Sequence, residues 1–122
     1  MPNVYVAPSS IAGDGLFAAK SFRKGDRVIG FRFKAARNKF VWKDMAAARS
    51  IPTDAAFVFN GKMLYDPKFT NQSKPMWYNF NHADAANTLI QKSGPMVAWY
   101  AARAIARDEE LTFDYVEPDP SW

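Results

Sequence analysis

The sequence contains no cysteine and only one histidine, and these two absences exclude several kinds of chemistry. Without cysteine there can be no disulfide, thiolate zinc site, iron–sulfur cluster or cysteine nucleophile. A single histidine excludes a metal site built from several imidazoles. No apolar run approaches the roughly 18 residues of a membrane span, and the first residues do not resemble a secretory leader. The chemistry must therefore depend on carboxylates, hydroxyls, backbone dipoles or a bound cofactor.

The remaining composition is that of a folded domain. The chain has 122 residues, of which 48% are hydrophobic and 16% aromatic. This length allows one domain, and the aromatic content is enough to build a compact core, which argues against a disordered chain. With no cysteine and no targeting signal, we expect a soluble intracellular protein with no membrane association.

Charge is unevenly distributed along the chain, although the net charge is only +4. Ten of the 16 Lys and Arg residues lie between Lys20 and Arg49, and six of the 12 acids lie between Asp108 and Asp119. Two separate electrostatic faces are therefore expected, either as plain solvated surfaces or as partner sites. Aromatic residues are interleaved in the basic stretch, and this mixture is compatible with nucleic-acid binding.

Local patterns predict a mainly β domain. Asn60–Gly61 is a two-residue hairpin signal, because both residues tolerate the positive φ angles of a type I′ turn. The alanine-rich segment 43–49, followed by Pro52, predicts the one clear helix. Strands are predicted over residues 4–7, 15–18, 27–33, 56–59, 62–65, 95–102 and 111–116.

Three segments carry residues suited to binding or catalysis. Gly13-Asp14-Gly15 allows close backbone approach to a ligand, although an ordinary turn has the same pattern. Residues 77–88 place Asn, His and Asp side chains beside two large aromatic residues, and we expect the lone His82 to be structural rather than a base. Residues 103–115 combine acids with an aromatic strand whose final Tyr115 can present a hydroxyl to a cleft.

Six motifs in order carry a family resemblance. They are residues 13–18 (GDGLFA), 24–29 (KGDRVI), 59–66 (FNGKMLYD), 81–87 (NHADAAN), 98–105 (AWYAARAI) and 109–115 (EELTFDY). In this order and spacing they resemble the SET-domain family of protein lysine methyltransferases, over residues 4 to 116. The last two motifs are the most specific.

The chain departs from the family pattern at four positions. Ala83 and Ala86 replace the Ser and Pro that follow the Asn-His pair, and Asp108 replaces a Gly. Phe31 stands where many members have Tyr. No cysteine-rich closing segment follows Tyr115, so the chain is similar to the minimal stand-alone SET proteins of viruses and phages.

The resemblance implies a fold that periodicity alone does not predict. SET domains have the β-clip architecture, in which short β-sheets surround a threaded C-terminal pseudoknot, with one or two short helices. We expect a single SET domain over residues 1–122, with an insert at about 34–56 and a C-terminal tail at 116–122.

The resemblance also implies methyl transfer from S-adenosylmethionine to the amine of a lysine in a protein or peptide, either a histone or another viral or host protein. Tyr115 is the expected catalytic residue, and no metal is expected. The expected cofactor-binding residues are Gly13, Asp14, Gly15, Leu16, Tyr78, Asn79, Asn81, His82, Tyr115 and Trp122. The expected lysine channel consists of Phe31, Phe57, Phe113 and Tyr115, where the three phenylalanines are equally explained as core.

Other aspects of the function stay open at this stage. A homodimer is one option, and a viral protein would act in the host cytoplasm, nucleoid or nucleus. The alternative function is a catalytically silent SET-like module that binds a peptide or nucleic acid, against which the retained Asn81, His82 and Tyr115 argue. In the family, Phe at position 113 leaves room for di- or trimethylation. Trp122 is expected either to stack on adenine or to pack in an apolar patch or dimer interface.

Overall fold

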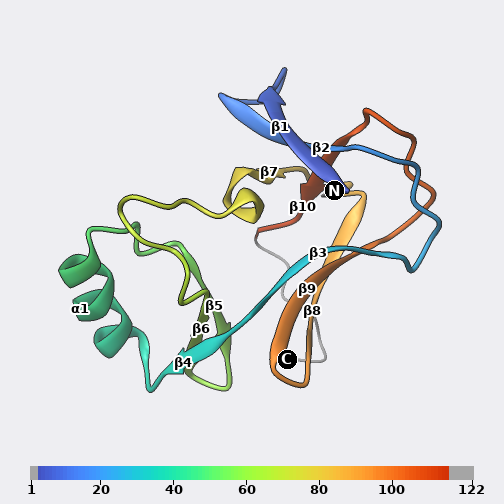
Figure 1. Cartoon of the computed structure of the whole chain (residues 1–122). Helices are drawn as coiled ribbons and strands as arrows, with labels where there is room; N and C mark the ends of the chain where they lie inside the picture. The colour runs from blue at the N-terminus through green and yellow to red at the C-terminus, as the bar shows by residue number, and fades with distance from the viewer. Residues whose placement is uncertain (1–2, 116–122) are drawn as a thin grey trace.

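The structure is a computed structural model that describes residues 3–115. The predicted position of Trp122 and of the tail therefore lies outside the described residues. The elements in chain order are β1 (Val4–Pro8), β2 (Asp14–Ala18), β3 (Arg27–Arg32), β4 (Lys34–Ala36), α1 (Lys39–Arg49), β5 (Ala56–Phe59), β6 (Lys62–Tyr65), the 3₁₀ helix η1 (Met76–Asn79), β7 (Asn81–His82), β8 (Thr88–Ser93), β9 (Met96–Ala101) and β10 (Glu110–Phe113) (Figure 1). The predicted mainly β architecture is confirmed.

The strands form three small sheets, with the orders β1-β2-β10-β7, β3-β9-β8 and β4-β6-β5. Strand β10 lies between β2, its antiparallel neighbour, and β7, its parallel neighbour (Figure 1). The C-terminal strand is thus inserted between segments from the beginning and the middle of the chain. The several small sheets agree with the β-clip architecture that the resemblance implied.

Buried side-chain hydrogen bonds hold β10 in this position. Asn87 is 3% exposed, and its side chain accepts a hydrogen bond from Thr112 N at 2.9 Å and donates to Glu110 O at 2.8 Å. Thr88 Oγ1 donates to Thr112 O at 2.6 Å. Because a buried polar group left without a partner costs about 1–3 kcal/mol, these bonds make a shifted register for β10 unfavourable.

The local turn predictions are confirmed for the β5–β6 hairpin. Asn60 and Gly61 have φ angles of 47° and 78°, as a type I′ turn requires. The helix, in contrast, begins at Lys39 rather than at residue 43. Asn38 extends it, because its side chain accepts hydrogen bonds from the amides of Phe40 and Val41 at 3.0 and 2.9 Å.

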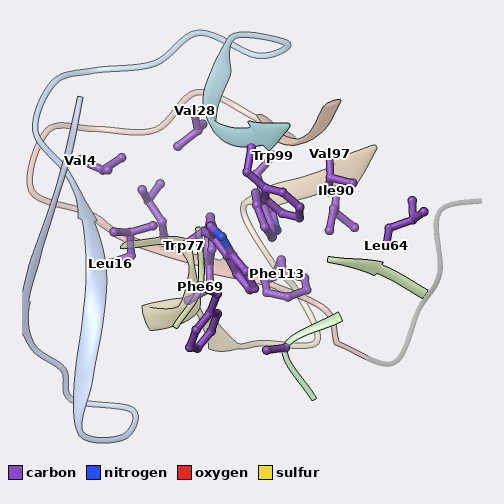
Figure 2. Packing of buried hydrophobic residues seen from close by; sticks show 14 of the residues in the cluster. Val4, Leu16, Val28, Leu64, Phe69, Trp77, Ile90, Val97, Trp99 and Phe113 are labelled. Atoms are coloured by element: carbon purple, nitrogen blue, oxygen red, sulfur yellow. The ribbon is translucent and has the colours of Figure 1, made fainter. Parts of the chain in front are cut away.

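Aromatic rings pack together within the buried core (Figure 2). Trp99 from β9 is fully buried, and its ring stacks on Trp77 and Phe80 with centroids 5.6 and 4.9 Å apart. Phe113 from β10 meets Trp99 edge-on at 5.6 Å. Replacing a buried ring of this size by Ala typically costs about 3–5 kcal/mol. The cluster therefore stabilises the fold and also forms the wall against which the site described below is built.

Within residues 3–115, no helix combines the length and the apolar character needed to cross a bilayer.

Candidate active site

A cavity of about 740 Å³ lies where β5, η1, β7 and the end of β10 meet. One part of its wall is aromatic and consists of Phe57, Trp77, Phe80, Phe113 and Tyr115. Another part is polar and includes Asp14, Asp54, Lys74, Asn79 and Asn81. A volume of this size, with apolar walls and a few polar groups, is typical of a small-molecule site.

Tyr115 lies at the end of the segment that follows β10, and its position is set by two hydrogen bonds. Its hydroxyl donates to the carbonyl oxygen of Phe80, and its amide donates to His82 Nδ1 at 3.1 Å. Its ring lies 4.7 Å from that of Phe113. Burial of the hydroxyl, with a smaller effect of the Asp54 charge, raises the pKa of Tyr115 above its ordinary value. The phenol is therefore neutral at pH 7, and its hydrogen is directed at the Phe80 carbonyl.

His82, which the resemblance placed among the cofactor-binding residues, does not line the cavity, and it contacts Tyr115 instead. Its Nδ1 accepts the Tyr115 amide, so Nε2 carries the hydrogen of the neutral ring and donates to Asp84 Oδ1 at 2.9 Å. The His82 and Tyr115 rings lie 5.2 Å apart. With both ring nitrogens engaged, the arrangement favours the expected structural role over that of a general base.

The predicted glycine segment lies at one side of the cavity. Asp14 lines the cavity, and Gly13 has a φ of 44°, which favours glycine. A Cβ at Gly15 would lie 2.4 Å from Glu110 Oε2, so no larger residue fits without a shift. The Leu16 side chain, in contrast, is fully buried in the core and pairs with Leu111 of β10 through the backbone. Leu16 could therefore contact a ligand only through its backbone atoms.

The predicted channel residues fall into two layers. Phe57, Phe113 and Tyr115 line the cavity directly. Phe31 is 6% exposed and lies behind them, with its ring 6.1 Å from Phe57 and 5.2 Å from Trp77. Phe31 therefore supports the channel wall without forming its surface.

Tyr78, Asn79 and Asn81 all line the cavity, so the first part of the segment 77–88 reaches the site. Tyr78 donates its hydroxyl hydrogen to Asp54 Oδ1 at 2.6 Å, and Lys74 Nζ lies 5.4 Å from the centre of the Tyr78 ring. Burial first, and the Asp54 hydrogen bond second, raise the pKa of Tyr78 above its ordinary value.

Ten lining residues were not predicted from the sequence, and four of them carry a charge or an aromatic ring that the site uses: Asp54, Lys74, Trp77 and Phe80. The last two belong to the run Trp77-Tyr78-Asn79-Phe80, and their place beside Asn81 could have suggested them. Asp54 and Lys74 lie in loops before β5 and before η1, and no local pattern marks them as site residues.

Among residues 3–115, no group of three or more His, Asp or Glu side chains is arranged to hold a metal ion.

Comparison with known proteins places this geometry in a family. No curated protein matches the chain. A solved structure of a Plasmodium falciparum protein assigned as a histone methyltransferase matches with a TM-score of 0.66 and 18% identity, covering 97% of this chain and 96% of that chain. An apo ctPRC2 structure with substitutions in Ezh2 matches with a TM-score of 0.71 and 22% identity, covering 96% of this chain and 15% of that chain.

At these identities the two structures show a shared fold. Membership rests on the sequence itself, because the model of the SET domain matches residues 13–116, which include the glycine segment, the Asn81–His82 pair and Tyr115. The chain that builds this cavity around an inserted C-terminal strand thus belongs to the SET-domain family.

Proposed function

We propose that the protein transfers a methyl group from S-adenosylmethionine to the side-chain amine of a lysine in a protein substrate. The observation that carries this proposal is the position of Tyr115, whose hydroxyl is held by the Phe80 carbonyl in a cavity with an aromatic wall and a polar wall. Membership of the SET-domain family supports the same reaction class. The finer features, namely the cofactor and the lysine substrate, are part of the proposal.

The polar wall fits the proposed cofactor. Its methionine end carries an ammonium and a carboxylate, and Asp14 and Asn79 supply an acceptor and an amide for these charges. Its adenine presents a planar ring, for which Tyr78 offers an aromatic face. When bound, S-adenosylmethionine supplies a methyl group already activated on a positively charged sulfonium.

The aromatic wall suits a lysine side chain. The ordinary pKa of a lysine amine is about 10.4, so nearly all lysines are protonated at pH 7 and cannot act as nucleophiles. Phe57 and Phe113 offer the amine no compensating charge, and burial among apolar rings disfavours the ammonium form. The channel would thus lower the pKa of the amine and align its lone pair.

Tyr115 would orient the amine rather than remove its proton. The phenol hydrogen is donated to Phe80, so the oxygen presents its lone pairs to the cavity. A neutral amine has two N–H donors and one lone pair. Accepting one N–H at Tyr115 directs the lone pair of the nitrogen along the channel, without a change in the protonation of the tyrosine.

The proposal is tested by binding and by transfer. We expect calorimetry to detect binding of S-adenosylhomocysteine, and labelled cofactor to mark lysines in a screen of histones and host lysates. Tyr115→Phe should keep the melting temperature and the cofactor affinity but lose about 100-fold or more in turnover. Absence of both binding and labelling would refute the proposal, and binding without labelling would favour a catalytically silent module.

A further inference from the structure

Glu110, the first residue of β10, directs its carboxylate at the loop between β1 and β2 rather than at solvent. Ser9 Oγ lies 2.8 Å from each oxygen of this carboxylate and donates to it. Asn81 Nδ2 donates to Glu110 Oε2 at 2.9 Å and lies 3.1 Å from Ser9 Oγ. All three side chains are half-buried. Segments separated by 72 and 29 positions in the sequence therefore meet at one carboxylate.

Ser9 and Asn81 also make hydrogen bonds within the loop between β1 and β2. Ser9 Oγ accepts the amide of Ile11 at 2.9 Å, and Ser9 N donates to Gly13 O at 2.8 Å. Asn81 Nδ2 also lies within hydrogen-bonding distance of the carbonyls of Ala12 and Asp14, at 3.1 and 3.2 Å. Because the Asn81 amide nitrogen has only two hydrogens, these acceptors share them, and the amide acts as a tie for the loop.

The carboxylate also packs directly against the loop backbone. A Cβ built on Gly15 would meet Glu110 Oε2 at 2.4 Å and Cδ at 3.0 Å. A larger residue at position 15 would therefore force the Glu110 carboxylate out of its place. This gives the second glycine of the Gly13-Asp14-Gly15 segment a physical reason that is independent of any ligand.

We propose that Glu110 is a positioning residue that sets the conformation of the loop from Ser9 to Gly15, and through it the polar wall of the cavity. The inference rests on the proposed function for its link to cofactor binding. Asp14 and Asn81 both line the cavity, and Glu110 determines where each lies without lining it. Asn81 then contributes to cofactor affinity mainly by holding the loop.

The charge of Glu110 is the feature to test. A carboxylate only accepts hydrogen bonds, whereas the amide of Gln replaces one acceptor by an NH₂ donor that would face the donors of Ser9 or Asn81. Glu110→Gln keeps the shape of the side chain but removes one of the two oxygen acceptors that face Ser9 and Asn81. Glu109→Gln is a matched control, because the neighbouring carboxylate pairs with Arg103 and Asn87 and has no contact with the loop.

Two measurements follow, and the first needs no ligand. In the free protein, we expect hydrogen exchange at the Ser9 and Ile11 amides to become about tenfold faster in Glu110→Gln, since hydrogen bonds to charged groups are worth about 1.5–3 kcal/mol. In calorimetry, the dissociation constant for S-adenosylhomocysteine should rise about tenfold. Glu109→Gln should lower the melting temperature but change neither quantity.

A second pair of variants keeps the test decisive if Glu110→Gln does not fold. Ser9→Ala removes the Oγ that contacts Glu110, Asn81 and the Ile11 amide, so its effect is measured at the Ser9 amide, where exchange should accelerate to a smaller extent. Gly15→Ala should weaken binding in the parent background and weaken it less in Glu110→Ala, where only the close contact with Ser9 Cβ at 3.0 Å remains. Unchanged loop exchange in both Glu110→Gln and Ser9→Ala would overturn the inference. Failure of the parent protein to bind S-adenosylhomocysteine would instead overturn the proposed function, with the exchange comparison still deciding the role of Glu110.

Discussion

Tyr78 and Asp54 are joined by a hydrogen bond of 2.6 Å that connects η1 to the loop before β5, across the cavity wall. The bond holds together two segments that share no sheet. It also fixes the phenol of Tyr78 in one orientation, with its hydrogen directed at Asp54. The polar wall of the cavity is therefore organised by a loop residue that no sequence motif marks.

This pair predicts an alkaline titration. The pKa of Tyr78 is raised above the ordinary value of 10 by burial and by Asp54, so the neutral phenol is favoured in the folded protein. Its contribution to stability is full below pH 10 and is lost as the pH rises through the folded pKa. In ultraviolet titration, Tyr78→Phe should remove a late-ionising tyrosine, and Asp54→Asn should shift that ionisation to lower pH. An unchanged late phase in Tyr78→Phe would assign it to another tyrosine.

A second prediction concerns the number of methyl groups transferred. Phe113 lies 9% exposed in the channel wall, with its ring 5.3 Å from Phe80 and 4.7 Å from Tyr115. A hydroxyl at this position would bind water and restrict rotation of a methylated amine. We therefore expect di- or trimethylated product from the parent and mainly monomethylated product from Phe113→Tyr, measured by mass spectrometry. Monomethylation alone by the parent would contradict this.

A third prediction concerns Asp108, which stands where the family has glycine. Its φ of 67° is in the left-handed region, and its carboxylate accepts the Tyr5 hydroxyl at 2.8 Å. Since this region costs a residue with a Cβ about 1–2 kcal/mol, Asp108→Gly should have little effect or stabilise, whereas Asp108→Ala should destabilise by about 1 kcal/mol. Urea unfolding measures both. Tyr5→Phe is the control that removes only the hydrogen bond.

A fourth prediction concerns acid stability. The Arg103 guanidinium, aided by the Ala106 amide and Asn87, lowers the pKa of Glu109 below the ordinary 4.5, although burial opposes the shift. The ionised Glu109 carboxylate therefore stabilises the folded protein above pH 4.5, and this contribution is lost as the pH falls through the lower pKa of the folded state. The difference in unfolding free energy between the parent and Glu109→Gln should be constant near neutral pH and shrink in acid. A difference independent of pH would show that the charge of Glu109 contributes nothing.

Structural features that depend on neighbouring residues could be predicted from the sequence, whereas features that depend on contacts between distant residues could not. The turn at Asn60–Gly61 and the existence of the helix depend on neighbouring residues, and both were predictable. The start of the helix was wrong by four residues, because the weight given to the alanines hid the cap at Asn38. The composition of a strand does not indicate which strands it pairs with. The position of β10 between β2 and β7 could therefore not be predicted from the local sequence.

The candidate site divides in the same way. Asn81, Phe113 and Tyr115 belong to motifs, and Tyr78 and Asn79 lie just before one. All five were predicted as site residues, and all of them line the cavity. The positions of Leu16 and Phe31 depend on which side of a strand faces the core, and burial separates both from the cavity surface. Asp54 and Lys74 reach the cavity only because distant loops converge there.

The central place of β10 has a consequence for how the protein is made. Residues 110–113 form the strand that pairs with Leu16 on one side and with Asn81 on the other. The same segment brings Phe113 and Tyr115 to the cavity. Protein synthesis begins at the N-terminus. Most residues that line the cavity are therefore synthesised before residues 110–113. Every nascent chain shorter than this point lacks an organised site. Folding must also await contacts across most of the sequence, which is typical of slowly folding topologies. A chain that ends before residue 110 would thus lack the strand that pairs with both β2 and β7.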